Sequence, residues 1–452
     1  MAPLVGIIAI ASIPFALSAL GIPAVIGLAA TGTILILSSI VSFVFLKYIT
    51  CARYDMRKHS FQEGECPGGR LYYRGNVPIL ELTDDPRQTG ERFGYLAGKA
   101  HGYLLGSQIY RLKKNLDLII HTVMRQPRAH KILTLLEEIR REIPEDYKQE
   151  MKGLADGYNR WANEAGIEAS MNENDVLLIQ LIADSKHFKI KGVNKLLSKI
   201  LEATHLSPST ACTRLLQRDP QNGVKLGGNT DWCPFGDGGA LSLVIVRKPQ
   251  NTASFGVPAQ IGIITGWNED LAIAMNVCPG ETKRVRGKPI ALFNRFLLEN
   301  AHSVQDVRRL IQRIRPLGPY HLSLADAAGS AACISPYQGY NESDTIRTLD
   351  GDKPLEVLNW RYPECKGGFF NSEARMKLLT RYFQQVMAYI PRDQIDWVKV
   401  IDNGLKLAPL VNSKITLHSM MFLPESDKVF LSWDNGYAAS STKQALSMSE
   451  VF

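Results

Sequence analysis

A long apolar segment opens the chain. The 46 residues before Lys47 carry no charged side chain, and Gly21-Ile22-Pro23 interrupts them near the middle. About 20 helical residues cross the ~30 Å hydrocarbon core of a bilayer, so this segment is long enough for two spans. It is also longer than the apolar region of a cleaved signal peptide and has no basic start. We therefore predict a membrane anchor at residues 1–48, as a hairpin of two helices in preference to a single long span.

Basic residues follow the apolar segment directly, at Lys47, Arg53, Arg57 and Lys58. Because positive charge accumulates on the cytoplasmic side of membrane spans, we expect the rest of the chain on that side, behind a hairpin or multi-pass anchor. The cysteine content agrees with a reducing compartment, since seven is an odd number and no C-x-x-C pair occurs.

Helical periodicity dominates the next part of the chain, residues 49–211. Apolar positions at helical spacing predict helices at 131–141, 145–165 and 173–188, and a further helix followed by an exposed polar linker in 195–211. Gly94, Gly98, Gly102 and Gly106 recur every four residues and so share one helix face. We interpret this stripe as close packing against a neighbouring helix.

The period changes after Cys212. Short runs rich in β-branched residues, bounded mostly by Gly, Pro, Asn or Asp, predict strands at 241–247, 260–265, 271–277, 320–325, 331–335, 416–422 and 429–433. Two amphipathic helices are expected among them, at 293–313 and 372–387. Without regular alternation of strand and helix, this order predicts an α+β fold of layered antiparallel sheets.

Composition excludes several classes of protein. Hydrophobic residues make up 45% and charged residues 21% of the 452 residues, as in a globular domain. The net charge of +8 permits an anionic surface or ligand, but no nucleic-acid-binding motif is present, so we expect no nucleic-acid partner. The nine His are dispersed and form no H-E-x-x-H, so we predict neither a metal nor another cofactor.

A set of polar residues surrounds Cys212 in the sequence. Ser209-Thr210-Ala211 precedes it, and Gly227-Gly228-Asn229-Thr230-Asp231 follows, with Asp231 nineteen positions after the cysteine. Further along come a stretch at 266–280 that contains Asn276, then Asn359-Trp360, then Ser372-Glu373-Ala374-Arg375. A cysteine alone would be typical of a buried structural position. The polar motifs that accompany Cys212 make a catalytic role the stronger hypothesis.

In order and spacing, these motifs resemble the N-terminal-nucleophile (Ntn) hydrolases, in the group of choloylglycine hydrolases and acyl-CoA:6-aminopenicillanic acid acyltransferase-like cysteine peptidases. The resemblance covers about residues 90–435 and is most specific at 212–231, 266–280 and 295–329. It implies a four-layer αββα fold and a precursor that cuts itself between Ala211 and Cys212. Residues 49–211 would then belong to the first chain, and 212–452 would form the catalytic second chain.

Elementary chemistry agrees with that implication. Cleavage before Cys212 would free its α-amine, whose pKa of about 7.7–8.0 lies close to the thiol's value of about 8.5. The amine can then take the thiol proton near neutral pH, so no catalytic His is needed.

The resemblance also implies roles for the other residues. Cys212 would be the nucleophile, Asp231 would orient its α-amine with Asn229 shaping the turn before it, and Asn276 and Asn359 would donate to the oxyanion. Arg375 would anchor the site electrostatically. Each also has a structural interpretation: a turn cap for Asp231, a strand-end turn for Asn276, a structural Asn359 and a solvated helix charge for Arg375.

At two positions this sequence differs from the bile-salt hydrolase pattern, and these differences narrow the choice between branches of the group. Gly228 stands where bile-salt hydrolases carry Arg, and Trp360 stands where a polar residue is expected after Asn359, so we favour the penicillin acyltransferase-like branch. The expected activity is hydrolysis of a linear amide, or acyl transfer, through an acyl-thioester. A membrane anchor favours a lipid substrate such as an N-acyl amine or N-acyl amino acid. The alternatives are a lipid ester deacylase on the same fold and a catalytically inactive anchored scaffold.

Overall fold

The computed structural model describes residues 63–83, 85–99, 129–167, 170–181, 183–184, 211–219, 221, 223–231, 242–256, 259–278, 287–336, 346–349, 353–359, 371–413, 416–434 and 437–452. The predicted anchor at 1–48 lies outside these residues, as do the linker residues 207–210, Gly102, Gly106 and Trp360. Within the described ranges, no helix is long and apolar enough to cross a membrane.

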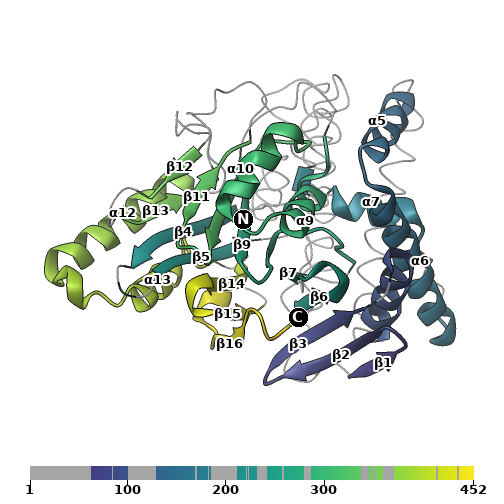
Figure 1. Cartoon of the computed structure of the whole chain (residues 1–452), viewed down its shortest axis with the longest axis horizontal. Helices are drawn as coiled ribbons and strands as arrows, with labels where there is room; N and C mark the ends of the chain where they lie inside the picture. The colour runs from purple at the N-terminus through teal and green to yellow at the C-terminus, as the bar shows by residue number, and fades with distance from the viewer. Residues whose placement is uncertain are drawn as a thin grey trace, which may run out of the picture. The chain divides into compact units, whose positions relative to one another are not determined.

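Two β-sheets form the centre of the described structure (Figure 1). The ten-stranded sheet has the order β1 (Gly64–Cys66), β2 (Gly69–Arg74), β3 (Val77–Leu82), β6 (Leu243–Arg247), β7 (Thr252–Gly256), β8 (Thr265–Trp267), β9 (Leu271–Val277), β10 (Tyr320–Asp326), β11 (Ala331–Ile334) and β12 (Ile346–Thr348). The six-stranded sheet has the order β13 (Leu355–Val357), β4 (Ala211–Asp219), β5 (Gly223–Asp231), β14 (Thr416–Leu423), β15 (Lys428–Trp433) and β16 (Gln444–Ser447). Neighbouring strands are antiparallel, except for the parallel pair β3 and β6.

The alternation of buried residues shows how the sheets are layered. In β6, Val244 and Val246 belong to a core shared by both sheets, whereas Leu243 and Ile245 pack into a second core with helices. In β4, Leu216 joins the shared core and Leu215 joins a core formed with helices of the other side. Because successive side chains of a strand point to opposite faces, the sheets pack face to face with helices outside each, in four αββα layers.

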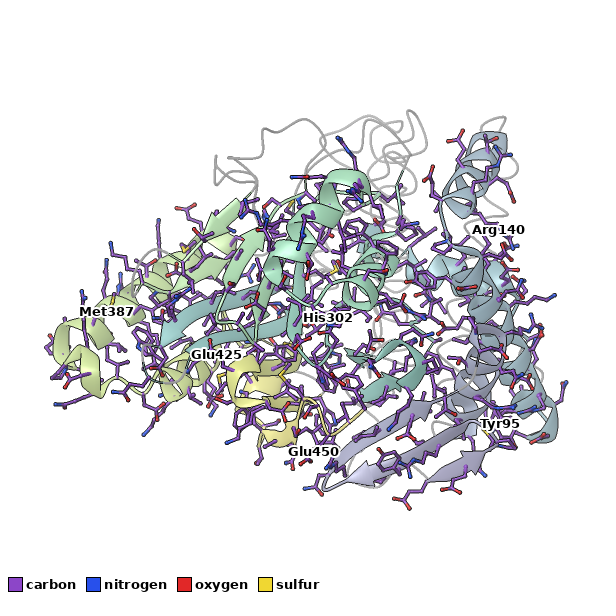
Figure 2. All side chains as sticks on the ribbon, in the orientation of Figure 1. Tyr95, Arg140, His302, Met387, Glu425 and Glu450 are labelled. Carbon is purple, nitrogen blue, oxygen red and sulfur yellow. The ribbon has the colours of Figure 1, made fainter. Side chains whose placement is uncertain are left out.

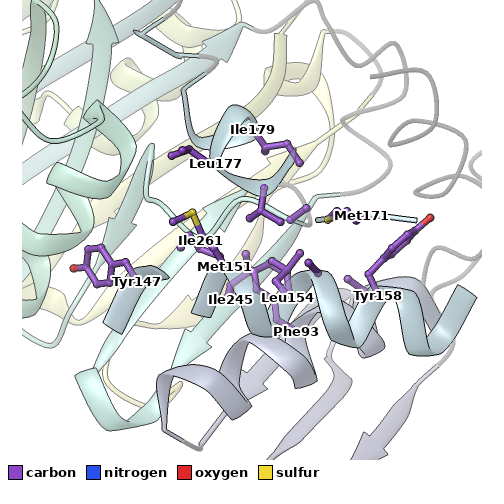
Figure 3. Packing of buried hydrophobic residues seen from close by; sticks show 14 of the residues in the cluster. Phe93, Tyr147, Met151, Leu154, Tyr158, Met171, Leu177, Ile179, Ile245 and Ile261 are labelled. Carbon is purple, nitrogen blue, oxygen red and sulfur yellow. The ribbon is translucent and has the colours of Figure 1, made fainter. Parts of the chain in front are cut away.

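Each outer face is covered by its own helices. The ten-stranded sheet is covered by residues 86–99, α6 (Glu145–Glu164) and α7 (Glu173–Gln180) in one core (Figure 3), and by α9 (Ile290–Asn300) and α10 (Val304–Arg313) in another. The six-stranded sheet is covered by α12 (Ser372–Tyr389) and α13 (Trp397–Leu405). A further helix, α5 (Ala129–Arg141), precedes α6.

The glycine stripe packs as predicted at its described positions. A Cβ atom on Gly94 would lie 2.1 Å from the carbonyl oxygen of Leu154, and one on Gly98 would lie 2.5 Å from the Trp161 ring, both in α6. Gly157 of α6 approaches the backbone of Glu91 in the same way. Tyr95, labelled in Figure 2, adds a hydrogen bond from its hydroxyl to the Glu164 carboxylate, at 2.8 Å. Because glycine has no side chain at these positions, the helix of residues 86–99 and α6 approach each other closely.

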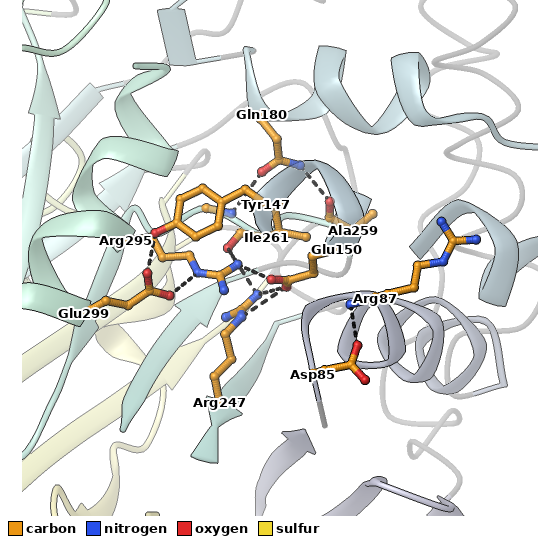
Figure 4. Close-up of polar contacts among 11 residues, drawn as sticks. Asp85, Arg87, Tyr147, Glu150, Gln180, Arg247, Ala259, Ile261, Arg295 and Glu299 are labelled. Atoms are coloured by element: carbon orange, nitrogen blue, oxygen red, sulfur yellow. Dashed lines mark hydrogen bonds and ion pairs between the residues drawn. The ribbon is translucent and has the colours of Figure 1, made fainter. Parts of the chain in front are cut away.

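A buried ion-pair network joins α6 to the ten-stranded sheet and to α9 (Figure 4). Glu150 is fully buried and accepts hydrogen bonds from Arg247 of β6, at 3.1 and 3.2 Å, and from Arg295 of α9. Arg295 also donates to Glu299 at 2.7 Å, and the Tyr147 hydroxyl donates to the same carboxylate. Every charge in the network therefore has an opposite partner.

Several elements differ from the sequence prediction. Residues 64–82, in the part expected to be helical, form β1, β2 and β3, with Gly68 and Gly75 at positive φ in the turns. The helix expected at 293–313 is two helices, because Ser303 caps α10 by accepting from the Asp306 N–H. The strand expected at 260–265 is irregular until Thr265. The helix expected at 173–188 ends at Gln180.

Candidate active site

The strand β4 places Cys212 in the interior rather than on an exposed linker. Ala211 pairs with Asp231 and Cys212 with Thr230, so the Ala211–Cys212 peptide bond lies at the beginning of a paired strand. Cys212 is only 4% exposed. Strand pairing thus begins at Ala211 itself, whereas the rest of the polar linker expected before it, residues 207–210, lies outside the described residues.

Asn359 contacts the backbone nitrogen of Cys212. The Cys212 N–H donates to Oδ1 of Asn359 at 2.6 Å, and Nδ2 of Asn359 donates to the carbonyl of Val277 at 2.7 Å. In this arrangement the amide oxygen of Asn359, rather than its donor group, faces the cysteine. Asn359 therefore holds the nitrogen that cleavage would turn into the α-amine.

Asn276 and Arg375 meet at the carbonyl oxygen of Cys212. Nδ2 of Asn276 donates to this oxygen at 3.0 Å, and Nη1 of Arg375 donates to it at 2.9 Å. Arg375 also donates to Thr213 Oγ1 at 2.9 Å and to Asn359 Oδ1 at 3.0 Å. Since Arg375 is buried and Asn276 lies within β9, neither is a solvated helix charge or a turn residue.

Asp231 ends β5 directly opposite the bond before Cys212. Its Oδ1 accepts from the Thr416 hydroxyl at 2.5 Å. Burial raises the pKa of Asp231 to about 6, and Arg375, the Thr416 hydrogen bond and Arg214 oppose that rise. Asn229 does not shape a turn, because it lies inside β5 and donates to the carbonyls of Leu405 and Val411.

Comparison with known proteins supports the resemblance found in the sequence. The family model described as acyl-coenzyme A:6-aminopenicillanic acid acyl-transferase matches residues 218–348, a range that includes Asp231 and Asn276. The resemblance to the Ntn hydrolases is confirmed. No curated protein sequence matches the chain.

Two solved structures are similar at low identity. The Caenorhabditis elegans ortholog of N-acylethanolamine-hydrolyzing acid amidase is 17% identical, over 47% of this chain and 93% of its own, with a TM-score of 0.38. The C2A mutant of the conjugated bile acid hydrolase from Clostridium perfringens is 13% identical, over 52% of this chain and 92% of its own, with a TM-score of 0.34.

The groups around the Cys212 thiol have opposite effects on its pKa. Burial raises the pKa of Cys212 most strongly, and the Asp231 carboxylate raises it as well. Arg214, the Asp231 backbone N–H and Arg375 lower the pKa. The net direction is upward, so in the uncut chain the thiol keeps its proton at neutral pH.

Four residues of this site were given no role from the sequence: Thr213, Arg214, Ser372 and Thr416. Ser372 Oγ accepts from Arg375 at 3.1 Å, and Thr416 holds Asp231 as described above. The Ser372 contact joins two residues three positions apart in α12, a spacing that the sequence does show, whereas the Thr416 contact joins segments far apart in the chain, so no local pattern indicates it. Arg214 did leave a signal, because its position two residues after Cys212 puts both on the same strand face.

The described residues offer no metal site. Among them, no group of three or more His, Cys, Asp or Glu side chains is placed to hold an ion.

Proposed function

We propose that this chain is an autoproteolytic Ntn cysteine amidohydrolase or acyltransferase that acts on linear amides through an acyl-thioester on Cys212. One observation carries the proposal: Asn359, Asn276 and Arg375, from three separate segments, all bind the backbone of Cys212. These contacts hold both the nitrogen and the carbonyl oxygen of Cys212, which suits a residue whose backbone must be kept in place for reaction.

Self-cleavage would begin with attack of the Cys212 thiol on the carbonyl carbon of Ala211. The carbon–sulfur bond forms, the carbon–nitrogen bond breaks, and the Cys212 nitrogen receives the proton that the thiol lost. Water then hydrolyses the thioester, which leaves a carboxylate on Ala211 and restores the thiol. Asn359 would orient the nitrogen throughout, and Asp231 would accept and return the proton.

The same groups would serve turnover. The free α-amine takes the thiol proton, the thiolate attacks the substrate carbonyl, and the protonated amine then gives its proton to the leaving nitrogen. Asn276 would bind the oxyanion of the tetrahedral intermediate, where a single donor contributes about 3–4 kcal/mol of transition-state stabilisation. The role of Asn359 as a second donor stays a prediction. Water as acceptor makes the enzyme a hydrolase, and an amine acceptor makes it an acyltransferase.

Self-cleavage is tested by purifying the full chain and sequencing the N-termini of its fragments. We expect residues 1–211 and 212–452 as separate chains, with Cys212 as the second N-terminus. Cys212→Ala should remain uncut, whereas Cys212→Ser should cut slowly. Cys333→Ala, at another buried cysteine, is the control and should cut at the wild-type rate. A single intact chain that still turns over substrate would overturn the cleavage, and an intact inactive chain would favour the scaffold.

The substrate class is a lipid amide such as an N-acyl amine or N-acyl amino acid, and this part of the proposal rests on the predicted anchor. The test presents the cut protein with N-acyl amines of graded chain length and with matched esters. Mass spectrometry of the Cys212 peptide should then show an acyl adduct from the amides. An adduct from the esters alone would favour the lipid ester deacylase.

We also propose that residues 1–48 anchor the enzyme in a membrane with the catalytic part on the cytoplasmic side. Full-length protein should then sediment with membranes and resist extraction by carbonate and by high salt, because apolar burial is not screened by ions. Deletion of residues 1–48 should release it. Release of the full-length chain by salt alone would exclude an inserted hairpin.

A further inference from the structure

Arg214 is a buried cation that lacks an ion-pair partner in the described part of the chain. Its side chain is fully buried. Two other fully buried cations, Arg247 and Lys225, each lie 3.1 Å from a carboxylate, of Glu150 and Asp219 respectively. Burial of a charge without a counter-charge is costly, so the retention of Arg214 requires a reason beyond packing.

Hydrogen bonds fix the guanidinium of Arg214 between the two sheets. Nη2 donates to Thr230 Oγ1 of β5 at 3.0 Å and to the Met275 carbonyl of β9 at 3.1 Å. Nη1 donates to the carbonyls of Thr213 and Asn229. All four acceptors are neutral, so they hold the group in place, and the Asp231 carboxylate interacts with its positive charge without forming an ion pair.

That charge faces Cys212. The two residues are two positions apart in β4, so they share one face of the strand, and the positive charge of Arg214 acts on the thiol. Among the charged groups near the thiol, Arg214 has the largest effect in lowering its pKa, larger than that of Arg375. Ionisation of Cys212 would therefore place a further negative charge beside Arg214, in addition to that of Asp231.

Gly228 provides the space for this arrangement. It lies directly opposite Arg214 in the β4–β5 register. A Cβ atom at position 228 would lie 2.4 Å from Cδ and 2.8 Å from Nη1 of Arg214. A side chain at position 228 and the side chain of Arg214 therefore compete for the same volume.

We propose that Arg214 is a catalytic residue that stabilises the Cys212 thiolate, and that Gly228 is required because the Arg214 side chain lies over it. The inference rests on the proposed function only in taking Cys212 as the nucleophile. It also gives the departure at position 228 a physical meaning: the cation is supplied from the neighbouring strand instead. The absence of Arg at position 228 is then no argument for an inactive scaffold.

The test measures ionisation of Cys212 without any substrate. The full-length protein is alkylated with iodoacetamide across pH 5–10, and mass spectrometry quantifies peptides that begin at Cys212 separately from those that continue through Ala211. Cleavage and thiolate formation are thus read independently, so an uncut chain would contradict the proposed function and still report on Arg214.

Arg214→Gln, which keeps hydrogen-bonding capacity and removes the charge, should raise the pH midpoint of alkylation by at least about one unit. Below the midpoint this lowers the alkylation rate about tenfold. Arg214→Lys, which keeps the charge and loses most of the hydrogen bonds, should shift it less. Arg218→Gln, at an exposed position of the same strand, is the control and should leave the midpoint unchanged.

If Arg214→Gln fails to fold, a variant that moves the arginine from position 214 to position 228 tests the proposal instead. The double variant Arg214→Ala with Gly228→Arg returns a guanidinium to the same volume and should restore a midpoint close to that of the wild type. A folded double variant with a raised midpoint would overturn the proposal. So would an unchanged midpoint in folded Arg214→Gln, or equal shifts in the Lys and Gln variants, which would indicate a structural role alone.

Discussion

Asn276, at the residue scale, has a contact that suits an oxyanion donor. Its Nδ2 donates to the carbonyls of Cys212 and Val357, at 3.0 and 2.9 Å, so the donor group is already held beside the nucleophile before any substrate binds. Both N–H groups of this amide are engaged in these bonds, so donation to an oxyanion would release one of the two carbonyls as charge develops, and the gain would come mainly in the transition state.

Replacement of Asn276 by Leu should therefore lower the acyl-transfer rate by about 10² to 10³ without unfolding the protein. The measurement compares the single-turnover acylation rate of Cys212 in the variant and the wild type, with circular dichroism as the check on folding. Asn300→Ala, at an exposed helix end, should acylate like the wild type. Wild-type acylation by Asn276→Leu would reduce this residue to a link between strands.

Asp231 gives self-cleavage a predictable dependence on pH. Its pKa is raised to about 6 by burial, so the carboxyl is mostly protonated below that pH and mostly ionised above it. Only the ionised form can accept the Cys212 proton. The cleavage rate should therefore rise as the pH increases through about 6 and then level off, when followed by gel after the freshly translated chain is diluted into buffers of graded pH.

Asp231→Asn tests whether Asp231 causes this dependence of the cleavage rate on pH. An amide of the same shape cannot titrate, so cleavage should be slow and should lose the rise near pH 6. Retention of the same rise in Asp231→Asn would assign the titration to another group, with the Cys212 thiol as the first candidate.

At the scale of elements, the Glu150 network holds α6, β6 and α9 together. Its three central charges are buried, and Glu150 is the carboxylate that both arginines share. The pKa of Glu150 is lowered: burial, the largest influence, raises it, but Arg295 and Arg247 together outweigh burial. Because the folded-state pKa lies below the ordinary value, this contribution is present above that value and is lost as the pH falls.

Glu150→Gln should lower the free energy of unfolding by about 3–5 kcal/mol, since Arg247 would stay buried without a counter-charge and Arg295 would keep only Glu299. The midpoint of unfolding in guanidinium chloride is best measured in the uncut Cys212→Ala chain, which unfolds as one polypeptide. The control is Glu373→Gln, which breaks the exposed Lys377–Glu373 pair and should leave the midpoint unchanged. Equal midpoints for both variants would contradict a stabilising role for the buried network.

At the scale of the whole molecule, strand pairing and ion pairs join the two fragments that the proposed cleavage would produce. The strand β3, from the first fragment, pairs in parallel with β6 of the second, from Ile79 opposite Val244 to Leu82 opposite Arg247. The Glu150 network also crosses between the fragments. The first fragment thus supplies part of the larger sheet as well as helices on its surface.

We therefore expect the two fragments to remain associated after cleavage. They should co-elute in size-exclusion chromatography in native buffer containing detergent, and should separate only under denaturing conditions, because separation would expose an edge of the ten-stranded sheet and the core beside it. Spontaneous separation of the cut fragments at neutral pH would contradict this picture of the interface.

Local sequence patterns determined much of this protein. The strand predicted at 271–277 has the bounds of β9, the helix predicted at 145–165 matches α6, and the spacing of Gly94 and Gly98 indicated a close helix contact. These features depend on backbone period and residue size, which neighbouring positions reveal. The motifs around Cys212 and Asp231 likewise identified residues that the fold brings together.

The tertiary structure alone decided which atoms meet. Nothing local shows that β3 pairs with β6, since parallel pairing joins residues far apart in the chain. Nor does any pattern show that Asn359 turns its oxygen to the Cys212 nitrogen, or that Gly228 leaves room for Arg214 beside the thiol. The physical reason is that periodicity sets the face on which a side chain lies, whereas its partner is set by long-range packing of sheets and helices around it.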